Sequence, residues 1–436
     1  MNPTVDTQPH PLRICLLSYR SNPHCGGQGV YVKNLSRALR DLGHRVTVLC
    51  GPPELRLAEG VRQVPLYGLD LYNPADPFRV PRLREFADPI NVIEWLGVAS
   101  MGFPEPFTFG LRALRFFRRQ PPVFDVLHDN QSLSYAIGSL NRRLPVVATI
   151  HHPATIDRRL AVREQTSVRG KLKQWRWYSF LGMQRRVARR LNPLITVSAS
   201  ARRDIGLDFG IPEERFRVIP NGIDTDLFRP LPGIPREPGR IIVTNSADMP
   251  LKGLTYLLSA VPEILRHRNP IRLAVIGSPR PGGAVERRVR SLGIGRWVEF
   301  TGRIGDDEFV TQYARAAVAV VPSVYEGFGL PVLEAMCCSS VVAASTGGAL
   351  PSVLGDAGLL FDPYDTGSLR DVLRRVLLLS PEEAANYRRA CRARAELHLA
   401  RLAAEPPLAH VVAADVQGAI AGCIQAEQQF DQRGLA

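Results

Sequence analysis

The chain has 436 residues, of which 45% are hydrophobic and 22% are charged, and its formal net charge is +14. The length exceeds what one ordinary core accommodates, so two domains are expected, and the composition is ordinary for a soluble globular protein. The positive charge favours an anionic partner, namely a nucleic acid, an anionic membrane or an anionic substrate. Residues 1–11 lack the apolar segment of a secretory signal, and no apolar run reaches the roughly 20 residues that span a bilayer.

The seven cysteines predict reduced thiols rather than disulfides. Their number is odd, they form no C-x-x-C pair, and Cys15, Cys50, Cys337 and Cys338 lie within apolar strand or helix patterns. Buried, reduced thiols are typical of a cytoplasmic protein, which is the expected location.

The first part of the chain predicts the opening of a doubly wound α/β domain. An apolar strand at 12–18 leads into a glycine-rich loop at 23–29, a helix at 30–42 and a second strand at 46–50. Residues 54–122 show little clear periodicity. Within them, a helix near 107–117 carries apolar residues interspersed with arginines, which fits either an ordinary surface helix or a basic amphipathic helix at a membrane interface.

Two histidine-bearing segments follow neighbouring strands. The strand at 123–127 ends at His128-Asp129-Asn130, and the strand at 145–150 ends at His151-His152-Pro153. Parallel α/β sheets place their sites at the carboxyl ends of strands. We therefore expect His151 to be an active-site histidine, with His152 and Asp129 as secondary candidates.

The segment 158–190 is strongly basic and aromatic. It holds eleven lysines and arginines against one acid, Glu164, and it includes Trp175 and Trp177. Cations and interfacial aromatics of this kind favour attachment to the inner, anionic face of a membrane. Binding of a soluble anionic acceptor and binding of single-stranded nucleic acid are the alternatives, but no nucleic-acid-binding fold signature accompanies the segment.

The second half of the chain repeats the alternation of strands and helices. Strands are expected at 241–244, 273–277 and 297–302, and a helix at 306–316, which together predict a parallel sheet with right-handed crossovers. Lys252-Gly253 follows the first of these strands directly. Asp224-Thr-Asp226 has the form D-x-D, and we assign it a structural role rather than metal binding.

A strand–turn–helix–strand unit at 318–351 has the features of a phosphate site. A strand at 318–321 precedes the turn at 326–330, the helix at 331–338 and a strand at 341–344, after which come Thr346-Gly347-Gly348. Free amides at the glycine turn and the helix dipole favour an anion. Glu326 and Glu334, eight residues apart, bracket this anion site.

The stretch Glu326-Gly-Phe-Gly-Leu-Pro-Val-Leu-Glu334-Ala resembles the hallmark of the family-4 glycosyltransferases, which are retaining enzymes of the GT-B fold. Thr149-Ile150-His151, the sequence Pro-Asn-Gly-Ile-Asp224 and the loop at 23–29 are also similar to that family. The resemblance covers roughly residues 12–50 and 123–380. It implies an α/β protein of two doubly wound Rossmann-like domains facing across a cleft: an acceptor-side domain at 12–222 and a nucleotide-sugar-binding domain at 223–395. A helical tail at 396–436 would pack back on the first domain.

The resemblance also implies roles for individual residues. His151, Glu326 and Lys252 would act in catalysis, the first two by orienting the sugar and Lys252 by stabilising the departing phosphate. The donor would be bound by Gly27, Ser246, Lys252, Arg303, Ile304, Glu326, Gly327, Phe328, Gly329, Leu330 and Glu334. The donor is expected to be a UDP- or GDP-linked sugar, bound as substrate, with no cofactor and no metal. From the basic segment at 158–190, rather than from the resemblance, the acceptor is expected to be lipid-linked, or a precursor of a cell-envelope glycan.

Two departures from the family pattern leave alternatives open. Ser246 stands where the family usually has the arginine of the diphosphate clamp, and the end of the chain has an alanine- and glutamine-rich run instead of an aromatic-rich helix. A nucleotide-sugar epimerase or phosphorylase of the same architecture, or a non-catalytic homologue that binds the donor, therefore remain alternatives to a retaining hexosyltransferase.

Overall fold

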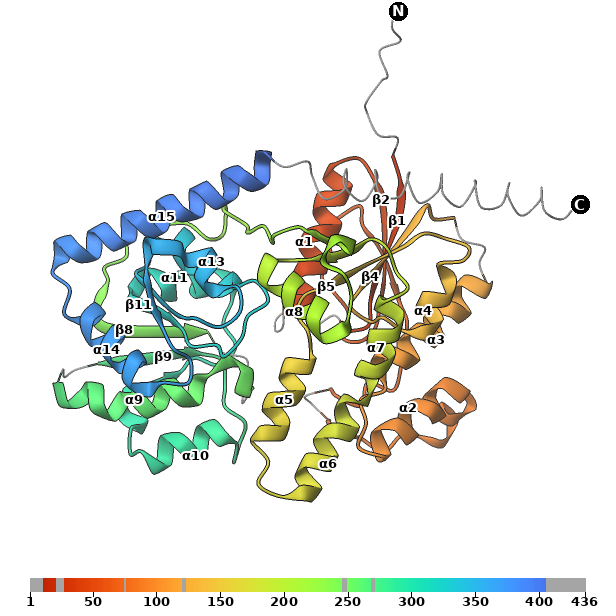
Figure 1. Ribbon diagram of the computed structural model, residues 1–436, viewed down its shortest axis with the longest axis horizontal. Coiled ribbons are helices and arrows are strands. Elements are labelled where there is room, and N and C mark those ends of the chain that lie inside the picture. Colours follow the sequence, from red (N-terminus) through yellow and green to blue (C-terminus); the bar gives the residue numbers. More distant parts are fainter. Residues whose placement is uncertain are drawn as a thin grey trace, which may run out of the picture. The chain divides into compact units, whose positions relative to one another are not determined.

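The computed structural model describes residues 11–20, 27–73, 76–119, 123–244, 249–267 and 271–404. These residues form two compact units (Figure 1). The first unit comprises the described residues up to 196 together with 202–219, and the second comprises 197–201 and the described residues from 220 onward. The predicted tail at 396–436 lies outside the described residues beyond 404.

The first unit is built on a parallel sheet. In its described part the strand order is β3-β2-β1-β4-β5-β6-β7. The strands are β1 (Arg13–Ser18), β2 (Arg45–Cys50), β3 (Arg62–Pro65), β4 (Val126–Asn130), β5 (Val146–Ile150), β6 (Leu194–Thr196) and β7 (Phe216–Val218). β1, β4 and β5 are almost completely buried, as expected for central strands covered on both faces.

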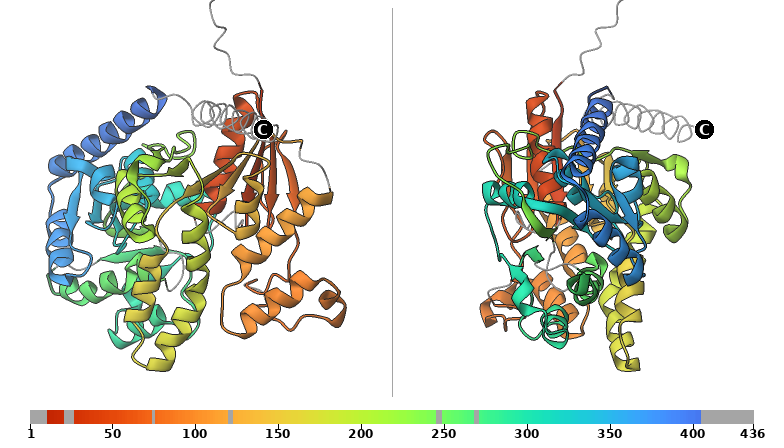
Figure 2. Two further views of the ribbon diagram at one scale, coloured as in Figure 1. Left: turned by 45° about the vertical axis from the view of Figure 1, so that its right-hand side comes forward. Right: turned by 90° about the vertical axis from the view of Figure 1, so that its left-hand side faces the viewer.

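Helices cover this sheet and extend beyond it. They are α1 (Gly27–Asp41), α2 (Pro89–Ala99), α3 (Glu105–Arg119), α4 (Tyr135–Leu140), α5 (Thr155–Arg163), α6 (Val168–Trp177), α7 (Leu181–Ala188) and α8 (Ala199–Phe209). Three short 3-10 turns accompany them: η1 (Leu83–Ala87), η2 (Tyr178–Phe180) and η3 (Glu213–Arg215). α1 packs Val32, Leu35 and Leu39 on the sheet. α5 and α6 form a pair that projects away from it (Figure 2).

The second unit has a second parallel sheet, of order β10-β9-β8-β11-β12-β13 in the residues described. Its strands are β8 (Glu237–Thr244), β9 (Arg272–Ile276), β10 (Val298–Phe300), β11 (Ala316–Val321), β12 (Val342–Ser345) and β13 (Leu359–Phe361). Its helices are α9 (Leu254–His267), α10 (Ala284–Ser291), α11 (Asp306–Arg315), α12 (Leu330–Cys337), α13 (Leu350–Leu354), α14 (Thr366–Leu377) and α15 (Pro381–Ala404), with 3-10 turns η4 (Pro250–Lys252), η5 (Gly295–Trp297) and η6 (Gly355–Ala357). One hydrophobic cluster joins α9, α10 and α14 to the sheet, and another joins α11, α12, α13 and α15 to it.

The structure confirms the predicted fold class, since both units are parallel sheets flanked by helices. The predicted strands recur within a few residues of their expected bounds. α1 starts earlier than expected, at Gly27 rather than 30, and α15 continues without a break through residue 396. Cys15, Cys50, Cys337 and Cys338 are buried free thiols, as predicted.

Candidate active site

The second unit brings Lys252 and Glu326 into direct contact. Lys252 ends the turn η4 after β8, and Glu326 lies on the turn after the adjacent strand β11. The Lys252 Nζ donates to Glu326 Oε1 at 2.7 Å, and the Ser323 hydroxyl donates to the same oxygen at 2.8 Å. Both charged side chains are partly exposed at 25% and 13%, so a ligand can reach the pair.

Glycines allow the backbone segments around this pair to approach closely. A Cβ on Gly253 would lie 1.8 Å from the Pro322 carbonyl oxygen, and one on Gly348 would lie 2.2 Å from the Glu326 oxygen. Gly348 also has a φ of +63°, which favours glycine. The segment Thr346-Gly347-Gly348 is therefore packed against the turn that carries Glu326 and fixes the position of that turn.

The turn ends in a helix whose first amides face no side-chain cap. Gly329 is the N-cap of α12, with a φ of +105°, and a Cβ at this position would collide with the Leu350 side chain. Leu330 and Pro331 form the first turn of the helix. Pro331 has no N–H and the Val332 and Leu333 amides bond to the Gly329 carbonyl, so the Leu330 amide and the helix dipole make this end of α12 suited to an anion.

Glu334 lies one turn further along α12 and is largely enclosed. The Tyr313 hydroxyl donates to Glu334 Oε2 at 3.2 Å. Burial raises the pKa of Glu334 to about 7, and the negative charge of Glu326 adds to the rise, while Tyr313 and Lys252 oppose it. Near neutral pH, Glu334 is therefore protonated in part of the molecules and ionised in the others.

The remaining donor-site candidates of this unit differ in their surroundings. The Gly327 carbonyl accepts from the Ser198 hydroxyl at 2.6 Å, and Phe328 is buried with its ring 5.6 Å from that of His398. Arg303 is exposed and Ile304 is partly buried, just after β10. Ser246 lies outside the described residues.

His151 in the first unit is held in one orientation. It follows β5, and its Nε2 lies 2.7 Å from the Oδ1 of Asn130 at the end of β4. Because an amide oxygen only accepts, Nε2 carries the proton and Nδ1 keeps a free lone pair. The Tyr31 ring meets the imidazole edge to face at 4.6 Å. Burial, together with the neighbouring His152 and His128, lowers the pKa of His151 to about 3, so the ring is neutral near pH 7.

The other candidates of the first unit have local partners. Asp129 is fully buried and accepts from the Ser132 hydroxyl and the Leu133 amide, so it holds the turn after β4. His152 lies 2.8 Å from Asp157. A Cβ on Gly27 would meet no atom within 4 Å, so packing within the protein does not require a glycine there.

Comparisons with known proteins identify the family. Residues 25–227 match the family described as Glycosyltransferase Family 4, and residues 239–378 match the one described as Glycosyl transferases group 1. The MMP alpha-(1->4)-mannosyltransferase of Mycolicibacterium hassiacum is 45% identical over 377 residues, covering 85% of this chain and 90% of that protein. The chain belongs to glycosyltransferase family 4. The D-inositol 3-phosphate glycosyltransferase of Acidothermus cellulolyticus is 28% identical to this family 4 enzyme, covering 84% and 83% of the two chains.

Solved structures support the fold of this family 4 glycosyltransferase. Sucrose-phosphate synthase from Thermosynechococcus elongatus matches with a TM-score of 0.66 at 22% identity, covering 97% of this chain and 99% of that one. WaaG, a glycosyltransferase involved in lipopolysaccharide biosynthesis, matches with a TM-score of 0.63 at 18% identity, covering 88% and 95%. Together with the two parallel sheets, these matches confirm the predicted two-domain GT-B class.

Three residues of this family 4 glycosyltransferase's sites were not among the predicted ones: Asn130, Ser323 and Tyr313. Asn130 is the last residue of β4 and Ser323 comes soon after β11, and this position at the carboxyl end of a strand was the available signal for them. Tyr313 sits on α11, and its spacing gave no sign of a contact with Glu334.

In the described ranges, no group of three or more histidine, cysteine or acidic side chains is close enough to hold a metal ion. Asp224 of the D-x-D sequence instead accepts from the Asp226 and Leu227 amides.

Proposed function

We propose that this enzyme is a retaining α-mannosyltransferase that uses a nucleoside diphosphate-linked mannose and needs no metal. The observation that carries the proposal is the 45% identity, across 85% of the chain, to a relative named as an α-(1→4)-mannosyltransferase. HepE from Anabaena, which shares the fold with a TM-score of 0.61 at 17% identity, covering 88% of this chain and 95% of that one, has been solved with UDP and glucose. Both UDP- and GDP-linked mannose are candidates for the donor.

The Lys252–Glu326 contact supplies the chemistry at the donor. A diphosphate attracts Lys252 away from Glu326, and the freed carboxylate then accepts hydrogen bonds from sugar hydroxyls. Charge that develops on the departing phosphate is stabilised by Lys252 and by the Leu330 amide at the start of α12. Glu334, ionised on binding, accepts from a ribose hydroxyl. The departing phosphate takes the proton of the acceptor hydroxyl as the bond from sugar C1 to the phosphate breaks and the bond from C1 to the acceptor oxygen forms, so the nucleoside diphosphate leaves and the acceptor arrives on the same face of the sugar.

His151 is assigned the role of orienting the mannose. Its Nε2–H is committed to Asn130, so its free Nδ1 accepts from a sugar hydroxyl. A neutral ring suits that role, and the low pKa of about 3 keeps it neutral across the physiological range. The open space at Gly27 is consistent with close approach of a ligand to the start of α1.

Ser246 stands where the family usually has the arginine of the diphosphate clamp. Exposed arginines at the carboxyl edge of the second sheet take over the role of that arginine. Arg280 follows β9 and Arg303 follows β10, and neither side chain has a hydrogen bond or ion pair within the described residues. β9 is the direct neighbour of β8, the strand that precedes Lys252. Arg280 is therefore the better placed of the two to complete the diphosphate site.

Donor binding tests these roles. In calorimetric titrations with GDP, UDP and their mannose conjugates, Lys252→Ala and Arg280→Ala should each weaken binding about tenfold or more, because each removes a charge-assisted contact. The control is Arg290→Ala, which removes an exposed cation of α10 that pairs with Glu286. Unchanged affinity in Lys252→Ala would refute the assigned phosphate contact.

Peripheral attachment to an anionic membrane is the second part of the proposal. α6 carries an apolar stripe of Val168, Leu172 and Trp175, which are 74%, 63% and 53% exposed. Their spacing of four and three residues places them on one face of the helix. Arg169, Lys171, Lys173 and Arg176 flank the stripe. No helix in the described part of the chain is long and apolar enough to cross a bilayer.

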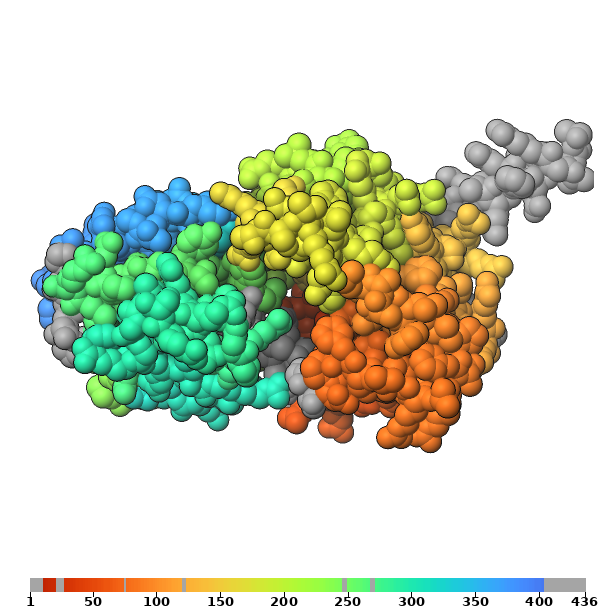
Figure 3. Space-filling model, turned by 90° about the horizontal axis from the view of Figure 1, so that it is seen from below, coloured from red at the N-terminus to blue at the C-terminus, as the bar shows by residue number. Residues whose placement is uncertain are grey.

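A second apolar surface adjoins α6. α2 buries only the charged Glu94 and exposes Ile93 and Leu96, and Leu83 of η1 is also exposed. The two elements meet where the Arg176 guanidinium donates to the Ser100 hydroxyl at 2.6 Å, and Figure 3 shows α5–α6 beside this region. Apolar side chains ringed by cations are suited to anionic lipid, with about 1 kcal/mol gained per cation near the surface. A lipid-linked acceptor would be delivered there.

Co-sedimentation with liposomes tests the membrane contact. The protein should pellet with anionic but not neutral vesicles, and salt should weaken the binding. Leu172→Gln with Trp175→Gln should abolish it, while Leu207→Gln, which alters an equally exposed leucine on α8, should not. A protein that stays in the supernatant with anionic vesicles at low salt would contradict the proposal.

A further inference from the structure

The second unit has a cavity that the donor site does not use. Its volume is about 520 Å³, which is within the range of small-molecule pockets. It lies at the amino-terminal edge of the sheet, where β8 begins at Glu237. The Lys252 turn follows the opposite end of β8, and the eight-residue strand separates the two edges by roughly 25 Å. A ligand here is therefore clear of the nucleotide sugar.

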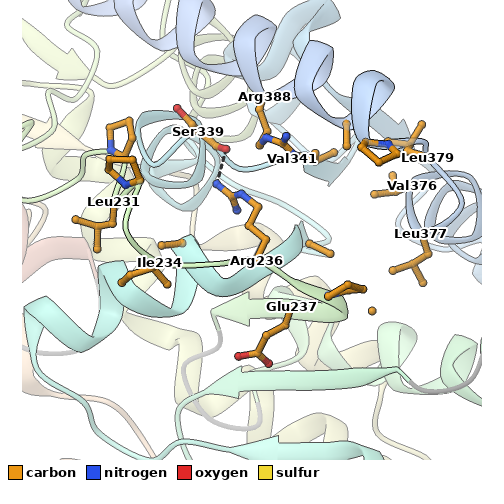
Figure 4. A pocket seen from close by; sticks show the side chains of 18 residues that line it. Leu231, Ile234, Arg236, Glu237, Ser339, Val341, Val376, Leu377, Leu379 and Arg388 are labelled. Atoms are coloured by element: carbon orange, nitrogen blue, oxygen red, sulfur yellow. Dashed lines mark hydrogen bonds between the residues drawn. The ribbon is translucent and has the colours of Figure 1, made fainter.

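The walls of the cavity are mostly apolar. Leu231 and Ile234 come from the segment before β8, and Val376, Leu377 and Leu379 come from the end of α14 and the residues after it (Figure 4). These side chains give the body of a ligand an apolar surface to contact. The charged residues that line the cavity are Arg236, Arg388 and Glu237.

Arg236 is a fixed positive charge on one side of the cavity. Its guanidinium donates to four carbonyl oxygens, those of Tyr313, Ala316, Cys338 and Ser339, of which the last is 2.7 Å away. Carbonyls hold the group in place but do not neutralise it. Burial, together with the nearby positive charge of Arg388, lowers the pKa of Arg236 to about 10.

Arg388 on α15 is the available cation. Across the ranges described, it makes no hydrogen bond and no ion pair, and it is only partly exposed. Figure 4 shows its side chain directed toward the cavity and that of Glu237 directed away from Arg236. Glu237 is engaged by Arg315 at 2.6 Å and by Arg240 at 3.3 Å. Two like charges thus share an apolar cavity without a carboxylate between them.

We propose that this cavity binds an amphiphilic organic anion, with a carboxylate or phosphate head on Arg388 beside Arg236 and an apolar tail along Leu231 and Ile234. The anionic head relieves the repulsion between the two guanidinium groups. The tail removes from water the apolar surface of the cavity wall. Arg236 also holds the carboxyl end of α12, whose other end belongs to the donor site. The site is independent of the identity of the transferred sugar.

Calorimetric titration with decanoate and decyl phosphate tests the site, and comparing the two distinguishes a carboxylate from a phosphate ligand. Decanol, which lacks the charge, and inorganic phosphate, which lacks the tail, should each bind at least tenfold more weakly than the better amphiphile. Arg388→Gln should weaken binding about tenfold or more, as expected for one charge-assisted contact. Arg389→Gln, on the exposed face of the same helix, is the matched control and should bind normally.

The Arg388→Glu variant shows whether a loss of binding comes from loss of the binding site or from unfolding of the protein. The new carboxylate would lie near Arg236, so the variant should melt no lower than the wild type and yet bind neither amphiphile. Saturating nucleoside diphosphate should leave amphiphile binding intact in the wild type. Equal affinity of wild type and Arg388→Gln for both amphiphiles, binding of decanol as tight as that of decanoate and decyl phosphate, or displacement by the nucleotide would each overturn the proposal.

Discussion

The protonation of Glu334 has a measurable effect on stability. Its pKa rises from an ordinary 4.5 to about 7 in the folded protein, mainly through burial. Between these values the folded chain holds a proton that the unfolded chain releases, so this contribution to stability is complete below pH 4.5 and is lost as pH rises through 7. A shift of roughly 2.5 pKa units corresponds to about 3 kcal/mol of unfolding free energy.

Replacing Glu334 with glutamine removes the titration and keeps the size of the side chain. Urea unfolding of wild type and Glu334→Gln at pH 5 and pH 8 should show the wild type losing about 2–3 kcal/mol more than the variant on going to the higher pH. Other titrating groups contribute equally to both proteins and cancel in the difference. A difference between the two proteins that stays constant from pH 5 to pH 8 would refute an elevated pKa at this position.

Three further predictions concern single substitutions. Gly348→Ala should lower donor affinity at least tenfold, measured by titration with the nucleotide sugar, because its Cβ would collide with the turn that carries the catalytic carboxylate. Asn130→Ala should reduce kcat with little change in the melting temperature, since His151 loses the acceptor that fixes its tautomer; an unchanged kcat would argue against that role. Arg112→Met should cost about 3–5 kcal/mol in urea unfolding, because it leaves Glu94, 5% exposed, without its ion-pair partner.

The sequence was sufficient to predict the elements that carry regular patterns. Continuous apolar runs marked the central strands, and the glycine turn with its two glutamates marked the start of α12. Polar residues at strand ends led to His151 and Lys252, because parallel sheets gather such ends at one edge. Each of these signals lies within a short stretch of the sequence, so it can be recognised without knowledge of the tertiary contacts.

Other features depend on contacts between distant residues. α2 shows no useful periodicity because its pattern is inverted: Glu94 points inward to Arg112, 18 residues later, while Ile93 and Leu96 face outward. The hydroxyl that bonds Glu334 belongs to Tyr313 on another helix. The cavity between the start of β8 and α15 depends on where α15 packs, which no local pattern reveals.

Product analysis distinguishes a retaining α-mannosyltransferase whose donor phosphate is stabilised by Lys252 from an inverting or inactive protein. The enzyme should be incubated with GDP- or UDP-mannose and a mannoside acceptor without added metal, and the anomeric configuration of the new linkage read by NMR. The account predicts an α-linked mannose from the α-configured donor, and a fall of about 10²–10³-fold in kcat for Lys252→Ala. A β-linked product, or full turnover by Lys252→Ala, would contradict it.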